Sequence, residues 1–171
     1  MKHFHAVTRS KLWFALALTL APLLAGCGSD LAGSREIEIV RITPNAPGLI
    51  YTSGLTSPLR AVINDQAALE QMWTTAFAAV GSPPQIPTID FTKEMVVVVA
   101  LGQRASGGYS IQVADAKMSR GALVIDVLLK SPGNRCAVTL SFTEPLDIVK
   151  IARVSGSVRF EDRSRVQSCG S

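Results

Sequence analysis

Histidine is nearly missing from this chain of 171 residues, because the only two, His3 and His5, lie at its amino-terminal end. Three basic residues there precede an apolar stretch, Leu12–Leu24, which is shorter than the about 20 residues that a spanning helix needs. This order is typical of an export signal, and removing the signal removes both histidines. The remaining chain cannot form a Ser-His-Asp or Cys-His catalytic unit and lacks the commonest zinc ligand. We therefore expect no enzyme, no metal and no cofactor.

The chain after the signal also lacks a large excess of either positive or negative charge. The whole chain has a formal net charge of +4, but Lys2, Arg9 and Lys11 belong to the signal. The rest has 14 basic and 13 acidic residues, which gives a net charge of +1. Without a basic stripe, nucleic acid is not an expected partner. The roughly 145 residues after the signal are enough for one domain with its own core.

Cysteine occurs only three times, and the first cysteine follows the apolar stretch directly. Leu24-Ala25-Gly26-Cys27 matches the bacterial lipoprotein box, which predicts cleavage before Cys27 and lipid attachment to it. The alternative is an ordinary signal peptide with a coincidental cysteine. Gly28 stands where inner-membrane retention signals usually place aspartate, which favours delivery to the outer membrane, facing the periplasm or the cell surface. We expect a signal over 1–26, a flexible tether over 27–35 and a single domain over 36–171.

The other two cysteines, Cys136 and Cys169, are expected to form a disulfide, since export leads to an oxidising compartment and an even count favours pairing. Closing a loop of about 34 residues would stabilise the fold by roughly 3–4 kcal/mol. The alternative is two unpaired thiols, with Cys136 buried at the head of a strand.

Strand patterns dominate the exported part of the chain. Met95–Leu101 (MVVVVAL) is continuously apolar and β-branched, which predicts a central strand buried on both faces. Other strands are expected from alternating or short apolar runs over residues 36–42, 49–51, 59–63, 109–114, 123–130, 136–142, 148–152 and 157–161. These patterns predict a mainly β (α+β) fold, an antiparallel sheet or sandwich of about seven or eight strands with one packed helix.

The single helical pattern follows Asn64 and Asp65, either of which can cap a helix, and ends near Gly81. Apolar residues recur at helical spacing along it (Leu69, Met72, Trp73, Ala76, Phe77 and Val80). On this stripe, Trp73 is expected to anchor the helix in the core rather than to stack on a ligand.

A short loop after the valine run contains more than a turn requires. It includes Gln103, Arg104, Ser106, Gly107, Gly108 and Tyr109, the last being one of only two tyrosines. Glycine is expected where a turn needs positive φ. Arginine and tyrosine are common anchors of protein interfaces. The loop therefore either only turns the chain or presents a partner-binding surface.

This loop and its surroundings resemble the PrcB C-terminal domain family, named after a lipoprotein subunit of a surface protease complex. The resemblance covers roughly 59–160 and departs from the family where Ala105-Ser106 replace Pro-Thr before the glycines and where Leu146 replaces a frequent aromatic residue. It rests on Leu69, Trp73, Phe91, Glu94–Val97, Leu101–Arg104, Gly107–Ile111, Cys136, Thr143, Pro145 and Ile148–Ile151.

The resemblance implies a non-catalytic module outside the cytoplasm that associates with another protein. We therefore expect a lipid-anchored accessory or stabilising subunit of an envelope or surface complex of the protease type. The alternative is a protease inhibitor, because residues 105–110 are also similar to the Asn-Pro-Thr-Thr-Gly-Tyr loop of chagasin-like inhibitors. That inhibitor would use the 104–109 loop as its wedge.

Overall fold

The computed structural model describes residues 34–43 and 52–170. The predicted signal, the lipid-attachment residue Cys27 and the short strand expected over 49–51 lie outside these ranges. The described chain forms eight strands and one helix. In chain order they are β1 Arg35–Glu36, β2 Ile39–Arg41, β3 Leu59–Ile63, α1 Gln66–Ala76, β4 Glu94–Ala100, β5 Ser110–Ser119, β6 Ala122–Pro132, β7 Leu146–Ala152 and β8 Ser157–Gln167.

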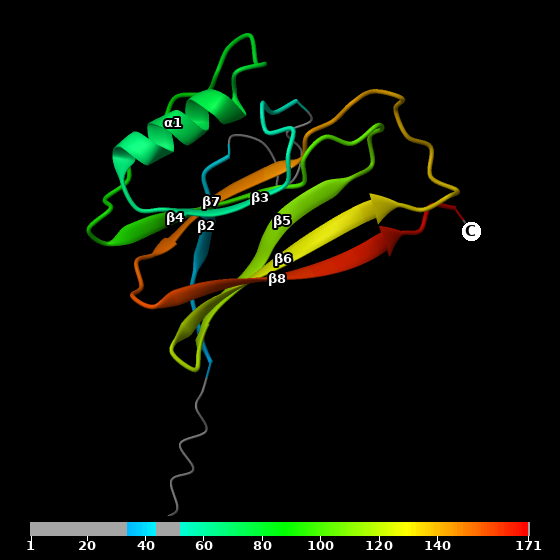
Figure 1. Cartoon of the computed structure of the whole chain (residues 1–171). Coiled ribbons are helices and arrows are strands. Elements are labelled where there is room, and N and C mark those ends of the chain that lie inside the picture. Colours follow the sequence, from blue (N-terminus) through cyan, green and yellow to red (C-terminus); the bar gives the residue numbers. More distant parts are fainter. Residues whose placement is uncertain (1–33, 44–51, 171) are drawn as a thin grey trace, which may run out of the picture. The chain divides into compact units, whose positions relative to one another are not determined.

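The strands form two sheets of four, which confirms the expected mainly β fold (Figure 1). We call the sheet with strand order β1-β5-β6-β8 sheet A and the sheet with order β2-β7-β4-β3 sheet B. All neighbouring strands are antiparallel except β6 and β8, which run parallel from Ala122↔Ser157 to Pro132↔Gln167. The chain leaves sheet A after β6, crosses to β7 in sheet B and returns to sheet A as β8 (Figure 1).

Strand β4 separates two apolar clusters, as its unbroken run of apolar residues predicts. Val97 and Val99 pack between the two sheets, against Ile111 and Ile125 of sheet A. The alternate residues of β4 face α1 on the other side of sheet B. Because side chains alternate along a strand, both faces of β4 are buried and no polar position is tolerated in its centre.

Helix α1 begins where the sequence predicts, since the Asp65 side chain accepts a hydrogen bond of 2.8 Å from the Ala68 N–H. It ends at Ala76, before the expected end near Gly81. Trp73 is only 2% exposed, and its indole N–H donates to the Pro84 carbonyl at 2.9 Å. Trp73 therefore anchors the helix in the core. Among the described residues, no helix has the length and apolar character needed to cross a membrane.

Two strand predictions are wrong. Residues 36–42 do not form one strand, because the chain passes from sheet A to sheet B after β1, and Ile37 fills the core at this crossing. Residues 136–142 form no strand at all. Their alternating apolar side chains, ending in Leu140 and Phe142, point largely to solvent, and their main chain bonds to the Gly-Gly loop instead of to a sheet.

A buried carboxylate joins the two sheets. Asp147 of β7 has no exposed surface, and its Oδ2 accepts a hydrogen bond of 2.8 Å from the N–H of Val113 on β5. Arg41 of β2 donates to the Val113 carbonyl at 2.6 Å, with its Nε 3.6 Å from Asp147 Oδ2. The pairing of β5 with β6 shifts register just after Val113. Two side chains of sheet B thus satisfy main-chain groups of β5 at its bulge.

Burial raises the pKa of Asp147 above 3.8, and this effect outweighs the Val113 N–H and the Arg41 charge, which lower the pKa. The folded protein therefore retains this proton at pH values where the unfolded chain has lost it. The contribution of Asp147 to stability therefore falls as pH rises above 3.8, until the folded carboxyl also ionises.

We predict that Asp147→Asn, which keeps an oxygen acceptor for Val113, becomes more stable relative to the unmodified protein as pH rises from about 4 toward neutrality. Chemical denaturation across this range measures the difference in the free energy of unfolding. Asp90→Asn is the matched control, since hydrogen bonds, chiefly from the Thr92 side chain, lower the pKa of the exposed Asp90 carboxyl to about 2. Because the unfolded Asp90 carboxyl ionises near 3.8, Asp90→Asn should become slightly less stable relative to the unmodified protein just above pH 4, the opposite direction, and its difference should then stay constant. The prediction would be contradicted if the difference in unfolding free energy between Asp147→Asn and the unmodified protein did not change with pH.

Candidate partner-binding loops

Two loops at one end of the sandwich are bonded to each other. The first, residues 103–109, links β4 to β5, and the second, residues 136–143, lies between β6 and β7. Arg104 and Thr143 exchange two main-chain hydrogen bonds, of 2.8 and 3.0 Å, and the Gly107 N–H donates to the Thr139 carbonyl at 2.9 Å. The Thr143 hydroxyl donates to the Ser106 carbonyl at 2.9 Å. We call this pair of loops the loop platform.

Gly107 and Gly108 allow the two loops to approach this closely. A Cβ at Gly107 would lie 2.4 Å from Thr139 Oγ1. Gly108 has φ +85°, and a Cβ there would lie 2.9 Å from Val138 Cγ1 and 3.0 Å from the Pro132 Cβ. The glycine pair thus has a packing role, and the close approach determines the shape of the platform.

Arg104 and Tyr109 are held within the molecule. The Arg104 guanidinium donates to the Leu101 carbonyl at 2.8 Å and lies 5.8 Å from the centre of the Tyr109 ring. Tyr109 is half-buried and packs against the core between the sheets. The exposed Gln103 donates to Glu144 at 3.1 Å. Of the six predicted loop residues, Arg104 and Tyr109 therefore brace the platform, and Gln103 and Gly108 are its exposed members.

The most exposed apolar side chains of the platform come from the second loop. Leu140 is 94% exposed and Phe142 is 63% exposed. Phe142 lines an open groove of about 480 Å³ between the two loops, together with Gly107, Gly108 and Val138. Apolar side chains on a braced main chain can enter a partner surface with little loss of conformational freedom. The platform therefore has the properties of a contact surface.

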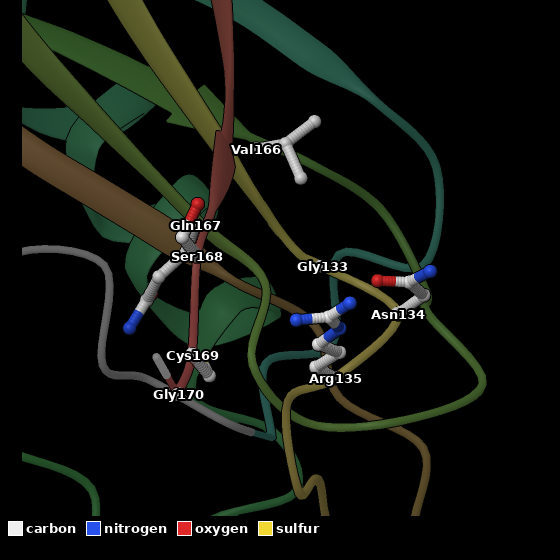
Figure 2. Close-up of a pocket in the computed structure, with 8 residues that line it drawn as sticks. All are labelled: Gly133, Asn134, Arg135, Val166, Gln167, Ser168, Cys169 and Gly170. Carbon is white, nitrogen blue, oxygen red and sulfur yellow. The ribbon is translucent and has the colours of Figure 1, made fainter.

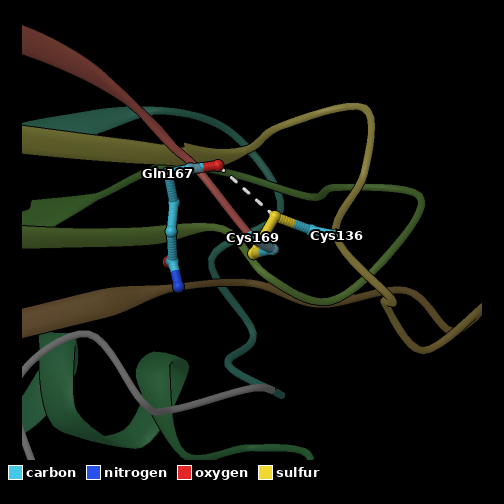
Figure 3. Close-up of a disulfide and its surroundings, with 3 residues drawn as sticks. All are labelled: Cys136, Gln167 and Cys169. Atoms are coloured by element: carbon cyan, nitrogen blue, oxygen red, sulfur yellow. Dashed lines mark hydrogen bonds between the residues drawn. A yellow bond between two sulfur atoms is a disulfide. The ribbon is translucent and has the colours of Figure 1, made fainter. Parts of the chain in front are cut away.

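The disulfide between Cys136 and Cys169 fixes the second loop at its start (Figure 3). The sequence expectation paired these same residues. The Cys136 sulfur lies 3.3 Å from the Gln167 carbonyl, a contact rather than a hydrogen bond because a disulfide sulfur carries no proton. Beside the bridge is a hollow of about 450 Å³, lined by residues 133–135 and 166–170 (Figure 2). The bridge ties the platform to the carboxyl end of β8.

The loop platform contains neither a cluster of metal-ligating side chains nor a titratable group with a clear pKa shift. Within residues 34–43 and 52–170, no three His, Cys, Asp or Glu side chains gather where they could hold a metal ion. The clear pKa shifts of the described residues occur at Asp90, Asp147 and Arg163, none of which belongs to the platform. The exposed side chains of the platform are both polar and apolar, with Gln103, Thr139 and Ser141 beside Leu140 and Phe142.

Sequence reasoning missed Leu140 and Phe142 because they were assigned to a strand. The pattern of residues 136–142 alternates as a half-buried strand does, and the pattern alone does not show that no partner strand is available. Two features of the sequence indicate that a strand here would have to be short. Turn residues precede Cys136, and Pro145 follows the segment.

The described chain is a β sandwich that presents two hydrogen-bonded loops at one end. The family model described as PrcB C-terminal matches residues 95–152, which confirms the resemblance that the sequence predicts. The match runs from β4 through β7 and includes both loops of the platform. The match covers one segment of the chain and leaves β1 to β3, α1 and β8 outside it. Searches of curated proteins and of solved structures find no significant match.

We predict that Gly108→Ala destabilises the protein more than Gly121→Ala does. Both glycines have positive φ, +85° and +79°, but a Cβ at Gly121 meets nothing within 4 Å. Gly121→Ala should cost about 1 kcal/mol for the backbone conformation alone. Gly108→Ala should cost at least about 2 kcal/mol, because overpacking adds to that penalty. Chemical denaturation of both variants measures the difference, and equal costs would show that the two loops do not pack as described.

Proposed function

We propose that this protein is a lipid-anchored, non-catalytic accessory subunit that binds a protein of the bacterial envelope through its loop platform, in a complex of the protease type. The observation that carries the proposal is the position of the family match. The matched segment contains both loops, and one of them exposes Leu140 and Phe142.

The internal contacts of the platform support a role in binding. Four hydrogen bonds join the two loops, and the disulfide fixes the second loop at Cys136. The main chain around Leu140 and Phe142 is therefore held before any partner arrives. Large apolar side chains at the centre of an interface carry much of its binding energy, and a preformed backbone lowers the entropy cost of association.

The lipid anchor is proposed from the sequence around Cys27. A lipidated cysteine followed by the tether of residues 27–35 would keep the domain near the membrane, since a flexible linker of this length reaches on the order of 15 Å. The partner would then also belong to the envelope, at the outer membrane facing the periplasm or the cell surface.

Replacing Cys27 by serine should abolish lipid attachment. We expect the Cys27→Ser protein to remain an uncleaved precursor or to become soluble, and to leave the detergent phase in phase separation. Labelling with a radioactive fatty acid checks the modification directly. Cys136→Ser is the control, since it removes a different cysteine and should keep both the label and the detergent partition. Unchanged labelling of Cys27→Ser would contradict the proposed anchor.

The platform is tested by placing a photo-crosslinking amino acid at Leu140 or Phe142 in the native envelope. We expect both positions to crosslink to the same envelope protein, identified by mass spectrometry as a protease or a subunit bound to one. Ile86 is the control, since it is exposed at 39% and lies between α1 and β4.

Phe142→Ser should weaken that association by about tenfold or more, since interface aromatics often contribute over 1 kcal/mol. Ile86→Ser should leave it unchanged. Crosslinks from Ile86 to the same protein, with none from the platform, would overturn the proposed surface. Inhibition of a purified cysteine protease by the protein in a dose-dependent way would instead favour the inhibitor function.

A further inference from the structure

Strand β8 leaves a long sheet edge open. It is 11 residues long and forms one edge of sheet A, whereas the other edge strands, β1, β2 and β3, have 2, 3 and 5 residues (Figure 1). All of β8 is exposed except Phe160, which is partly buried. In the described part of the chain, no strand pairs with its outer edge. Proteins usually keep edge strands short or cover them, because unpaired main-chain groups can bind another strand.

The main-chain groups that face this open edge can be assigned. The Gln167 carbonyl accepts a hydrogen bond of 2.9 Å from the Gly133 N–H, which directly follows β6. The N–H and C=O of one strand residue point to the same side, and successive residues alternate. The odd-numbered residues of β8 therefore bond to β6. The even-numbered residues direct their N–H and C=O groups to the open edge (Val158, Phe160, Asp162, Ser164 and Val166).

The strand is fixed in place without using this edge. Arg60 of β3 makes two hydrogen bonds to the Asp162 carboxylate, of 3.1 and 2.8 Å. Phe160 packs against the core, and the disulfide at Cys169 holds the chain two residues beyond the end of β8. An incoming strand would thus meet a template that is already ordered, which lowers the entropy cost of binding.

The side chains of β8 also differ between its two faces. Phe160 and Asp162 face sheet B, so the odd-numbered residues face away from it. Their charged members are Arg159, Glu161, Arg163 and Arg165. Arg159 pairs with Glu161 at 3.0 Å and Arg163 pairs with Asp126 of β6 at 2.6 Å, so Arg165 supplies the positive charge that these ion pairs leave. On the opposite face, Val158 and Val166 are exposed apolar residues. A strand docked beside β8 would therefore place one of its faces next to arginines and the other next to apolar groups.

We propose that β8 binds an extended segment of another protein by β-strand addition, and that this segment alternates acidic with apolar residues. Main-chain hydrogen bonds to the even-numbered residues supply affinity, and the positive charge of the face that carries Arg165 selects the acidic side chains. A second copy of this chain fits less well. The antiparallel register that pairs β8 with itself over its whole length places Arg159 opposite Arg165 and Asp162 opposite Asp162, and the one favourable charge pair that it makes is Glu161 opposite Arg163.

This inference goes beyond the proposed function, because β8 lies outside the matched residues 95–152 and is a different surface from the loop platform. The side chains of β8 indicate the sequence pattern of its partner segment, whereas the loop platform indicates no such pattern. A substitution that abolishes binding at one surface should therefore leave binding at the other surface unchanged.

The test uses the full-length protein in detergent and a synthetic peptide as long as β8, in which glutamate alternates with valine and threonine. The comparison peptide has lysine at every glutamate position. Amide hydrogen exchange is followed at each residue of β8. Without peptide, the even-numbered amides should exchange fast and the odd-numbered ones slowly. The acidic peptide should slow the even-numbered amides, and the lysine peptide should not.

Two variants sharpen the result. Arg165→Glu should weaken binding of the acidic peptide by about three- to tenfold, while Lys93→Glu, the same charge change at a side chain that is 80% exposed, should not. Ser164→Pro removes one outward N–H at an edge position that tolerates proline, and it should abolish slowing at the neighbouring even-numbered amides. Ser164→Ala is its control.

Equal binding of the two peptides would overturn the proposal, as would slowed exchange outside β8. Protection of the even-numbered amides that grows with protein concentration alone, together with dimers in sedimentation, would show that a second copy is the occupant and would also overturn it. Phe142→Ser should bind the acidic peptide normally, and Arg165→Glu should keep the crosslinks from Leu140. These two results separate a failure at β8 from a failure of the loop platform.

Discussion

The sandwich depends on hydrogen bonds to the main-chain groups of β5 along the part of its edge that has no partner strand. Strand β1 pairs with Lys117 and Met118 of β5, and the Ile37 N–H donates to the Ala116 carbonyl at 2.8 Å. Beyond this point the side chains of Asp147 and Arg41 bond to the main chain of Val113. A carboxylate accepts from the N–H, and a guanidinium donates to the carbonyl. Two charged side chains thus replace a missing strand, and they hold sheet B against sheet A at the bulge of β5.

The loop platform follows from the same arrangement. Strands β4 and β7 are neighbours in sheet B, paired from Glu94↔Ala152 to Ala100↔Leu146. The loop after β4 and the loop before β7 therefore begin side by side, and the Arg104–Thr143 bridge continues their pairing beyond the sheet. Because β4 is buried on both faces, its end is rigid. The two loops are therefore anchored to the sheet where they begin, and their hydrogen bonds to each other restrict them more than a surface loop without such contacts.

The sequence predicts the features that depend on local patterns. The valine run of β4, the Asp65 cap and the Trp73 anchor were all assigned correctly, because burial on two faces, capping and helical spacing leave direct traces in the order of residues. The strand predicted over residues 136–142 was wrong, because a strand needs a neighbouring strand to pair with. The sequence does not show which other segment lies beside these residues. The internal contacts of Arg104 and Tyr109 are not visible in the sequence for the same reason. Their partners, Leu101 and the core between the sheets, come together only in the folded protein.

The crossing of the chain between the sheets sets an order for folding. Strand β8 pairs in parallel with β6, but β7 lies between them in the chain and belongs to the other sheet. During synthesis, β6 must wait for two further strands before its second neighbour exists. Cys169 follows β8, so the disulfide can close only after that strand has been made. Contacts between distant residues form slowly. Until β8 is in place, one edge of β6 keeps its main-chain groups unpaired, and an unpaired strand edge can bind another chain.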